Sequence, residues 1–283
     1  MAEFNFIEQL RLEGKAERTI EEYARRVRLW YQYLIDQGVA DIMAATQDQV
    51  IDYQKQLLSQ GLSVRTVNVK VSTISVYYEM ALVRGLVTTN PVPKGIYIRT
   101  VDPNTPRLSD EALQQFEGWI DTLQDNVRAA FWCLYGTGAR VGEVANLRHA
   151  DVRLKSGAVY VNIRDAKWGS DREIPIMHAK AAKIVYEFAF AQYPTSKPLF
   201  RLSKRTIQGY ATSFAHTTGI AFHCHVLRHT FATRLIEQGI PLAKVQFLLG
   251  HKSPAMTLHY TKNAEFDVTS FAPIVYAPKK ERK

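Results

Sequence analysis

Residues 158–176 read AVYVNIRDAKWGSDREIPI. This stretch distinguishes the predicted fold class from an all-helical one. Its two ends are rich in β-branched residues, which pack well on a pleated surface, and Gly169 lies in the turn-forming segment between them. Two such runs joined through a glycine-containing turn predict an antiparallel hairpin. Elsewhere the apolar residues recur mostly at helical spacing. We therefore expect a mainly α protein with a small antiparallel β-sheet.

The first ninety residues predict a bundle of four helices joined by short connections. Thr19 and Glu22 have the spacing of a capping box, and Thr46 and Ser63 precede further helical segments as N-caps. Each predicted helix ends at a glycine, the residue that best tolerates the left-handed conformation of a helix C-terminus: Gly14, Gly38, Gly61 and Gly85.

A proline-rich stretch, residues 88–110, follows the bundle. It contains four prolines and little periodicity, and proline also restricts the residue before it, so the stretch predicts extended chain between two domains. We place a helical domain at 1–92, a linker at 93–106, a second domain at 107–276 and a basic tail at 277–283.

Helical patterns resume in the second domain. Ser109 is placed as an N-cap with acids in the first turn behind it, and residues 126–138 and 141–154 continue the helical pattern. Beyond the hairpin, residues 179–250 again predict helices. The second domain is therefore expected to be mainly helical around one small sheet.

The charge of the chain is uneven. The net charge is +9, with a pI near 9.4. Residues 1–95 carry eleven basic and eleven acidic side chains, so the entire excess lies in residues 96–283. A basic surface of this kind suits a polyanion-binding protein, because neutralising phosphates releases counterions. Charge alone leaves open a mildly basic protein that binds no nucleic acid.

Other features of the composition predict a cytoplasmic protein. The longest apolar runs are too short to span a bilayer, and the N-terminus resembles no signal peptide. Both cysteines, Cys133 and Cys224, lie in apolar stretches, which indicates a reducing compartment without disulfides. We expect a cytoplasmic, nucleoid-associated protein that has no contact with the membrane.

The stretch LYGTGARVGEV, residues 134–144, does not fit a nucleotide-binding loop. Its G-x-G-x-x-x-G spacing is one residue too long for the dinucleotide fingerprint, and no Walker lysine follows. What remains is a short glycine turn that delivers Arg140 to the start of a helix, with Glu143 one turn later. Taken alone, the two residues favour a surface ion pair at i,i+3.

The stretch FHCHVLRHTFATRL, residues 222–235, raises the question of a metal site. His225 and His229 stand at i,i+4, but a zincin requires glutamate where Val226 stands, so zinc is disfavoured. The other interpretation pairs His225 with Arg228 on one helix face, where an imidazole and a guanidinium face a single phosphate. We expect neither a metal nor another cofactor.

The stretch LLGHKSPAMTLHYTK, residues 248–262, contains a candidate nucleophile. The chain has no G-x-S-x-G elbow and no aspartate cluster for a two-metal site. A phenol attacks phosphorus when its proton is removed and cations hold the developing charge. Tyr260, with His251 and His259 nearby in the sequence, fits that role. From this stretch alone, a structural aromatic on a helix face beside Leu258 is the favoured interpretation.

Taken together and in this order, the motifs resemble the tyrosine recombinase (phage integrase) family in its compact, Xer-like form. The matching pieces are GARVGEV with Arg140, the hairpin lysine Lys167, HVLRHTFAT with His225 and Arg228, LLGH with His251, and Tyr260 nine residues later. The resemblance covers nearly the whole chain. It implies a SAM-like core-binding helical domain at 1–92 and a mixed α/β catalytic domain at 107–276.

The resemblance also implies a role for each of these residues. Arg140 and Arg228 match the arginines that clamp the scissile phosphate, and Glu143 matches the acid that holds the first arginine. His225 matches the histidine that assists proton removal, and His251 the group that donates to a non-bridging oxygen.

Two more roles follow from the resemblance. Lys167 matches the lysine that protonates the departing 5′-oxygen, although Trp168 follows it where the family often has glycine. Tyr260 matches the nucleophile that forms a 3′-phosphotyrosine bond. That bond conserves the energy of the phosphodiester, so religation requires neither ATP nor metal.

The implied function is site-specific DNA recombination through a Holliday junction, in integration, excision or resolution on chromosomes or mobile elements. The implied assembly on double-stranded DNA is a homotetramer, or a heterotetramer with a second recombinase, with or without accessory proteins. Two alternatives are a non-catalytic DNA-binding protein of the same fold and a relaxing enzyme like the type IB topoisomerases. Basic residues that we expect to contact DNA are Arg65, Lys70, Arg201, Lys204 and Arg205.

Overall fold

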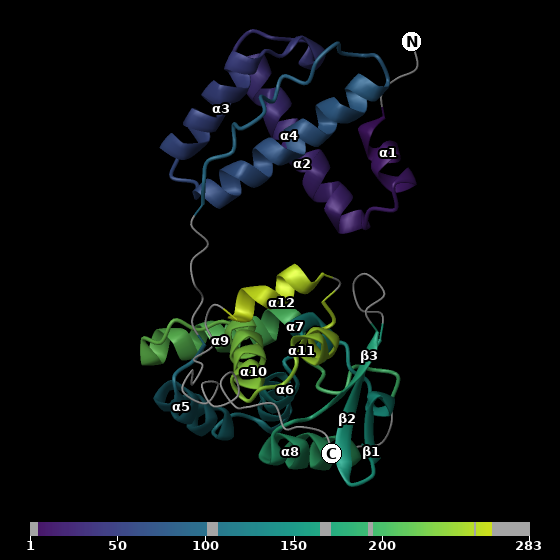
Figure 1. Cartoon of the computed structure of the whole chain (residues 1–283), viewed down its shortest axis with the longest axis vertical. Coiled ribbons are helices and arrows are strands. Elements are labelled where there is room, and N and C mark those ends of the chain that lie inside the picture. The colour runs from purple at the N-terminus through teal and green to yellow at the C-terminus, as the bar shows by residue number, and fades with distance from the viewer. Residues whose placement is uncertain (1–4, 101–106, 165–170, 192–194, 252, 262–283) are drawn as a thin grey trace, which may run out of the picture. The chain divides into compact units, whose positions relative to one another are not determined.

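The computed structural model describes residues 5–100, 107–164, 171–191, 195–251 and 253–261, except for the side chain of His259. The chain divides into two compact units, Met1–Asp102 and Pro103–Lys283 (Figure 1). Among the described residues, none of the helices combines the length and the apolar content that a membrane span needs.

The first unit is helical throughout its described part (Figure 1). Its elements are α1 Phe6–Leu12, α2 Glu17–Asp36, the 3-10 helix η1 Ile42–Ala44, α3 Gln47–Ser59 and α4 Val64–Val83. Trp30 of α2 and Tyr78 of α4 lie fully buried in its core. The Trp30 Nε1–H donates to the Tyr78 hydroxyl at 3.0 Å, and that hydroxyl donates to the Ile42 carbonyl at 2.6 Å. Both buried polar atoms are therefore hydrogen-bonded, as burial requires.

The helix starts of this unit confirm two of three predicted caps. Thr46 forms a capping box with Gln49, and the Ser63 hydroxyl accepts the Thr66 N–H. The predicted capping box of Thr19 and Glu22 is wrong. Helix α2 begins at Glu17, because the Ala16 carbonyl already accepts the N–H groups of Thr19 and Ile20. Thr19 therefore lies inside the first turn of α2, where it does not cap the helix.

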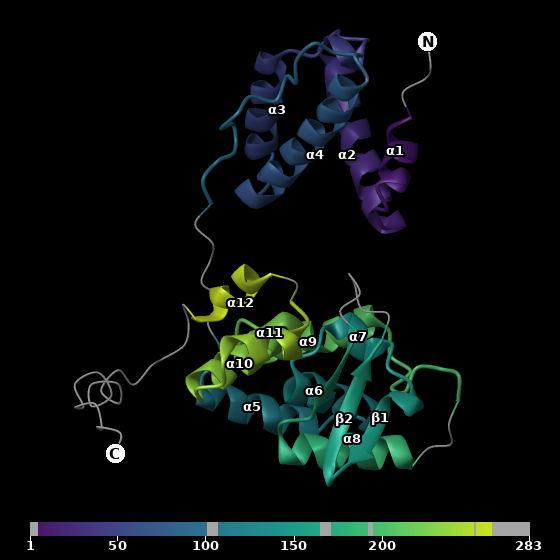
Figure 2. The same cartoon turned by 45° about the vertical axis from the view of Figure 1, so that its right-hand side comes forward.

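The second unit combines helices with a three-stranded sheet. Its elements are α5 Asp110–Asp121, α6 Asp125–Thr137, α7 Val141–Ala145, η2 His149–Asp151, β1 Val152–Lys155, β2 Ala158–Ile163, β3 Arg172–Pro175, α8 Ala179–Phe190, α9 Lys204–Thr218, α10 Cys224–Glu237, α11 Leu242–Leu249 and α12 Pro254–Thr261. Helix α8 packs against α6 and the sheet, while α10, α11 and α12 contact one another (Figures 1 and 2). This mainly helical fold with a small antiparallel sheet is the predicted fold class.

The sheet has the strand order β1-β2-β3, with both pairs antiparallel. The predicted antiparallel pairing of β2 and β3 is confirmed, with Val161 opposite Ile174 and both side chains buried; the turn with Gly169 lies outside the described residues. The predicted helix over 141–154 is wrong beyond Ala145. Residues 152–155 form β1 instead, because the left-handed residues Ser156 and Gly157 turn the chain back and let Val152 pair with Val161.

Helix α6 forms the centre of the second unit and sets the position of the turn that follows it. Nearly all of its side chains are buried, and it ends at Gly138 in the left-handed conformation with φ +62°. A Cβ atom on Gly138 would overlap the Phe231 ring of α10, and one on Gly136 would lie 2.7 Å from Ile176 Cγ2. The end of α6 can therefore approach both neighbours only because these positions are glycine.

Candidate active site

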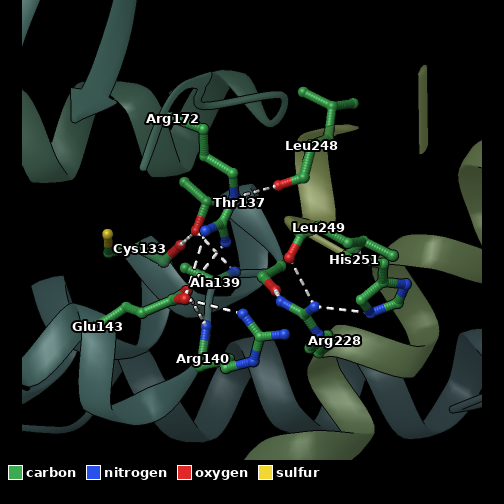
Figure 3. Close-up of polar contacts among 11 residues, drawn as sticks. Cys133, Thr137, Ala139, Arg140, Glu143, Arg172, Arg228, Leu248, Leu249 and His251 are labelled. Carbon is green, nitrogen blue, oxygen red and sulfur yellow. Dashed lines mark hydrogen bonds and ion pairs between the residues drawn. The ribbon is translucent and has the colours of Figure 1, made fainter. Parts of the chain in front are cut away.

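The turn after α6 places Arg140 at the N-cap of α7 (Figure 3). The Thr137 hydroxyl, which donates to the Cys133 carbonyl at 2.6 Å, accepts the Ala139 N–H at 3.2 Å. Glu143 then binds Arg140 twice: its carboxylate accepts the backbone N–H at 2.8 Å and the side-chain Nη1–H at 2.9 Å. Backbone and guanidinium are thus fixed by one buried acid, and the predicted pair of Arg140 and Glu143 forms part of a buried cluster.

Arg172, at the start of β3, is a member of this cluster that the sequence motifs did not reveal. Its side chain is 2% exposed, and its Nη2 lies 2.9 Å from Glu143 Oε2 while Nη1 donates to Oε1 at 3.3 Å. Burial alone would raise the pKa of Glu143, but hydrogen bonding and charge from Arg172, joined by Arg140, lower the pKa below its usual value. Glu143 therefore remains a carboxylate between two cations.

Arg228 of α10 lies on the other side of the same turn (Figure 3). Its Nη1 donates to the Gly138 carbonyl at 3.0 Å, and its Nη2 to the Leu249 carbonyl at 2.7 Å. Burial lowers its pKa to about 10, with Arg140 acting in the same direction and Tyr260 and Glu143 opposing it. The guanidinium therefore keeps its positive charge at neutral pH.

His251 follows the C-terminus of α11 and contacts Arg228 directly. Arg228 Nη2 lies 2.8 Å from His251 Nε2, and Nδ1 lies 2.9 Å from the Thr257 hydroxyl. Because a guanidinium only donates, Nε2 accepts, and Nδ1 carries the proton that is donated to Thr257. Burial, followed by the charges of Arg228 and Arg140, lowers the pKa of His251 to about 3, so the ring is neutral.

Tyr260 of α12 packs against two histidines. Its ring is stacked on that of His251, with centroids 5.7 Å apart and planes 11° apart. The His229 ring meets it edge-on at 4.9 Å. With 5% of its surface exposed, Tyr260 is buried within the same cluster that contains Arg228. A break separates His251 from the helices on either side, because α11 ends at Gly250 with φ +64° and α12 begins at Pro254.

His225 stands in the first turn of α10, on the exposed side of the cluster. Desolvation lowers the pKa of His225, and electrostatic interactions with Arg228, His223, Arg140 and Lys204 lower it further. The ring is thus biased toward its neutral form, which is able to accept a proton.

Lys204, predicted only as a DNA contact, begins α9 beside this site. Its Cδ would lie 3.9 Å from a Cβ atom on Gly142. Lys204 is exposed, as are Arg201, Arg205 and, in the first unit, Arg65. Lys70 is partly buried; burial and then Arg25 and Arg26 lower its pKa.

One predicted site residue cannot be placed. Lys167 lies outside the described residues, as does Trp168 beside it. Within the described part of the chain, no group of three or more histidine, cysteine, aspartate or glutamate side chains is arranged to hold a metal ion. The described cluster brings together Arg140, Glu143, Arg228, His251 and Tyr260, with His225 at its edge.

Two family models match the chain. The Phage integrase family matches residues 107–266, more than half of the chain, and the Phage integrase N-terminal SAM-like domain matches residues 5–85. These two matches cover the cluster and the helical first unit respectively.

Individual relatives agree with the family models. The chain is 31% identical over 274 residues to the tyrosine recombinase XerC of Oceanobacillus iheyensis, a match that covers 90% of this chain and 89% of the relative. It is 28% identical to the tyrosine recombinase XerA of Pyrococcus furiosus over 267 residues, 91% of this chain and 87% of the relative.

Solved structures share the fold. The Tn1549 transposon integrase in complex with a circular intermediate DNA superimposes with a TM-score of 0.75 at 19% identity, covering 93% of this chain and 95% of the other. The lambda integrase dimer bound to a COC′ core site gives 0.72 at 21% identity, covering 91% and 75%. With its family model, relatives and fold in agreement, the chain belongs to the phage integrase family and is a tyrosine-type site-specific recombinase.

Proposed function

We propose that Tyr260 attacks a scissile phosphate of bound DNA to form a 3′-phosphotyrosine bond and release a 5′-hydroxyl. The observation that carries this proposal is the stack of Tyr260 on His251, whose Nε2 accepts from the buried guanidinium of Arg228. A phenol that attacks phosphorus needs cations in place for the charge that develops in the transition state. Arg228 and Arg140 supply two such cations, on either side of the turn that ends α6.

The proposed roles follow from the contacts. Arg140 and Arg228 bind the non-bridging oxygens, for which the planar guanidinium fork suits a phosphate. His225 takes up the phenolic proton, since its lowered pKa favours the neutral form at neutral pH. Lys167, outside the described residues, would protonate the leaving 5′-oxygen. Because the covalent bond stores the energy for religation, the proposed cleavage and religation use neither ATP nor metal.

His251 requires a rearrangement before it donates to the phosphate. Without DNA its Nε2 is an acceptor, satisfied by Arg228. A phosphate that engages Arg228 would free Nε2, and a proton shift to Nε2 would leave Nδ1 to accept a hydrogen bond. The Thr257 hydroxyl serves either tautomer, because it both donates and accepts. We propose that this pair switches tautomer when the phosphate binds.

For the whole chain we propose a core DNA-binding domain at 1–92, a linker at 93–106, a catalytic domain at 107–276 and a basic tail at 277–283. A hollow of about 600 Å³ between α2 and α4 supports DNA binding by the first domain. Arg26 and Arg65 line it, and the partly buried Lys70 lies close to Arg26. Neutralised phosphates there would release counterions.

The proposed assembly is based on the assembly of a solved relative. One solved relative is a lambda integrase tetramer bound to a Holliday junction, with a TM-score of 0.68 at 21% identity. We propose that this chain also acts as a tetramer on two DNA sites, alone or with a second recombinase and accessory proteins. The proposed compartment is the cytoplasm, at the nucleoid, and the outcome is integration, excision or resolution.

The test is to trap the covalent intermediate. Duplex sites are selected by binding of the full chain from a random pool and then nicked, so that cleavage releases a short strand and religation fails. We expect an adduct at the wild-type tyrosine in EDTA, and none with Tyr260→Phe. Adduct formation by Tyr260→Phe would refute the nucleophile assignment. Complete absence of adduct would favour a non-catalytic DNA-binding protein, and relaxation of plasmids that lack a selected site would favour a type IB topoisomerase-like activity.

A further inference from the structure

Arg172 has no role in the reaction outlined above, although it is one of the most deeply buried charged side chains of the described chain. We propose that Arg172 is a positioning residue: its guanidinium joins Glu143, and through it Arg140, to the C-terminus of α11, so that Arg140 and His251 face the same phosphate. This inference rests on the proposed function, which it deepens.

The first half of the link is the ion pair with Glu143. Arg172 spans both carboxylate oxygens of Glu143, through Nη2 to Oε2 at 2.9 Å and Nη1 to Oε1 at 3.3 Å. The same two oxygens hold Arg140 by its side chain and by its backbone N–H. The direction of the Arg140 guanidinium therefore depends on where Arg172 holds the carboxylate.

The second half is a contact with the end of α11. Arg172 Nε donates to the Leu248 carbonyl at 2.8 Å, beside the bond from Arg228 to the Leu249 carbonyl (Figure 3). The last carbonyls of a helix lack partners within the helix and carry partial negative charge, so a guanidinium is a favourable cap. His251, which contacts Arg228 and stacks on Tyr260, lies two residues beyond Leu249.

The two arginines thus form parallel bridges between the same pair of segments. Arg228 joins Gly138 to Leu249, and Arg172 joins Glu143 to Leu248. Both guanidinium groups are buried, but Nε, Nη1 and Nη2 of Arg172 all donate to Leu248 and Glu143, whereas Arg228 has a proposed contact with the phosphate. Arg172 therefore acts on the geometry of the site, without touching the substrate itself.

A rigid, planar fork is needed for this link. Arginine presents donors in fixed directions to two partners, while the ammonium group of lysine is a point charge on a flexible stem. Removing the cation would leave Glu143 buried with Arg140 alone, and an uncompensated buried charge is costly. The carboxylate would then shift toward Arg140 and turn its guanidinium away from the phosphate.

The test compares Arg172→Met and Arg172→Lys with a matched control on the same strand. Glu173→Gln removes the exposed ion pair with Lys155, at 2.7 Å, one residue away from Arg172. On the nicked substrates, single-turnover adduct formation should fall about 100-fold in Arg172→Met, the loss expected of a misplaced catalytic group. Arg172→Lys should fall between Arg172→Met and wild type, Glu173→Gln should keep the wild-type rate, and all three should bind the duplex as wild type does.

A neutral methylphosphonate at the scissile position separates positioning from support of the fold. It carries no charge for Arg140 to neutralise, so the loss in Arg172→Met should shrink to less than about tenfold on this substrate. An equal loss on both substrates would show a purely structural role and overturn the inference. If thermal unfolding shows that Arg172→Met does not fold, Arg172→Lys carries the same comparison.

The same experiments distinguish failure of the proposed function from failure of the proposed positioning role of Arg172. A wild-type chain that forms no adduct on selected duplexes contradicts the proposed function and this inference with it. A wild-type chain that forms the adduct through Tyr260, alongside an Arg172→Met variant that does so at the wild-type rate, overturns the inference alone.

Discussion

The His251 ring stacks on the Tyr260 ring at a centroid distance of 5.7 Å, and its Nε2 accepts a hydrogen bond from Arg228. One neutral imidazole therefore touches both the proposed nucleophile and one of the proposed phosphate ligands. The three side chains come from α10, the loop after α11, and α12. The proposed nucleophile is thus held close to the cationic cluster by the packing of its own chain.

Thr257 pairs with Nδ1 of His251 in either tautomer and should affect the reaction. Thr257→Val removes the hydroxyl that pairs with Nδ1, leaving a buried N–H whose loss of pairing costs about 1–3 kcal/mol. We expect lower stability and an adduct rate reduced about tenfold to 100-fold, whereas Thr257→Ser, which keeps the hydroxyl, should retain most activity. Single-turnover trapping on the nicked substrate measures both variants; equal rates for the valine and serine variants would contradict the proposed tautomer switch.

The neutral, buried state of His251 makes stability depend on pH. Its folded pKa of about 3 lies below the value near 6.5 of an unfolded histidine. As the pH falls below about 6.5, the unfolded chain takes up a proton that folded His251 does not, so the free energy of unfolding decreases. The lowered pKa of His225 also decreases the free energy of unfolding as the pH falls. That contribution is present both in the wild type and in a variant that lacks His251.

His251→Gln isolates this contribution. Urea unfolding at pH 7.5 and pH 5 should show that the wild type loses more stability than His251→Gln on acidification. The same or a larger loss in the variant would mean that His251 becomes protonated in the folded protein.

Gly138 should tolerate no side chain. Alanine there would combine a left-handed backbone with overlap of the Phe231 ring, each worth about 1–3 kcal/mol. We expect a lowered melting temperature and loss of adduct formation, because Arg140 lies two residues later. The control is Gly118→Ala in the interior of α5, where a Cβ atom meets nothing within 4 Å and alanine should stabilise by about 1 kcal/mol. Calorimetry measures the melting temperatures of both variants. Equal melting temperatures would contradict the described packing.

The salt dependence of DNA binding tests the predicted contacts. Each lysine or arginine that neutralises a phosphate contributes about 0.9 to the slope of log K against log salt. Arg65→Ala and Arg205→Ala should each weaken binding and reduce the slope by about that amount. Lys183→Ala, which removes an exposed cation paired with Glu187 on α8, serves as the control. A slope unchanged by Arg65→Ala or Arg205→Ala would remove that residue from the interface.

The sequence predicted the parts of the site that depend on local chain geometry. The glycine turn before Arg140, the i,i+3 spacing of His225 and Arg228, and the breaks at Gly250 and Pro254 are all visible in short stretches. These features depend on the conformations that glycine and proline allow and on helical periodicity. The fold class followed from the same signals.

Features that depend on tertiary contacts were missed. Arg172 stands between Asp171 and Glu173, where it looks like one more solvated charge; the available signal was its two-residue spacing from Ile174, which places both on the inner face of β3. The local pattern of residues 152–155 predicts helix, and only their pairing with β2 makes them the strand β1. The tautomer of His251 follows from Arg228, twenty-three residues earlier, and no local pattern contains it.

The close fit of Gly250 against Arg172 restricts how the two positions can vary in evolution. A Cβ atom at residue 250 would lie 2.7 Å from Arg172 Nη1, so a larger residue there either displaces the guanidinium from its partners or requires a shorter side chain at 172. The two positions should therefore covary among related chains, whereas no such coupling is expected for a glycine that faces open space, such as Gly219. A chain that keeps the arginine also keeps the left-handed end of α11, and with it the direction in which the backbone leaves toward Tyr260.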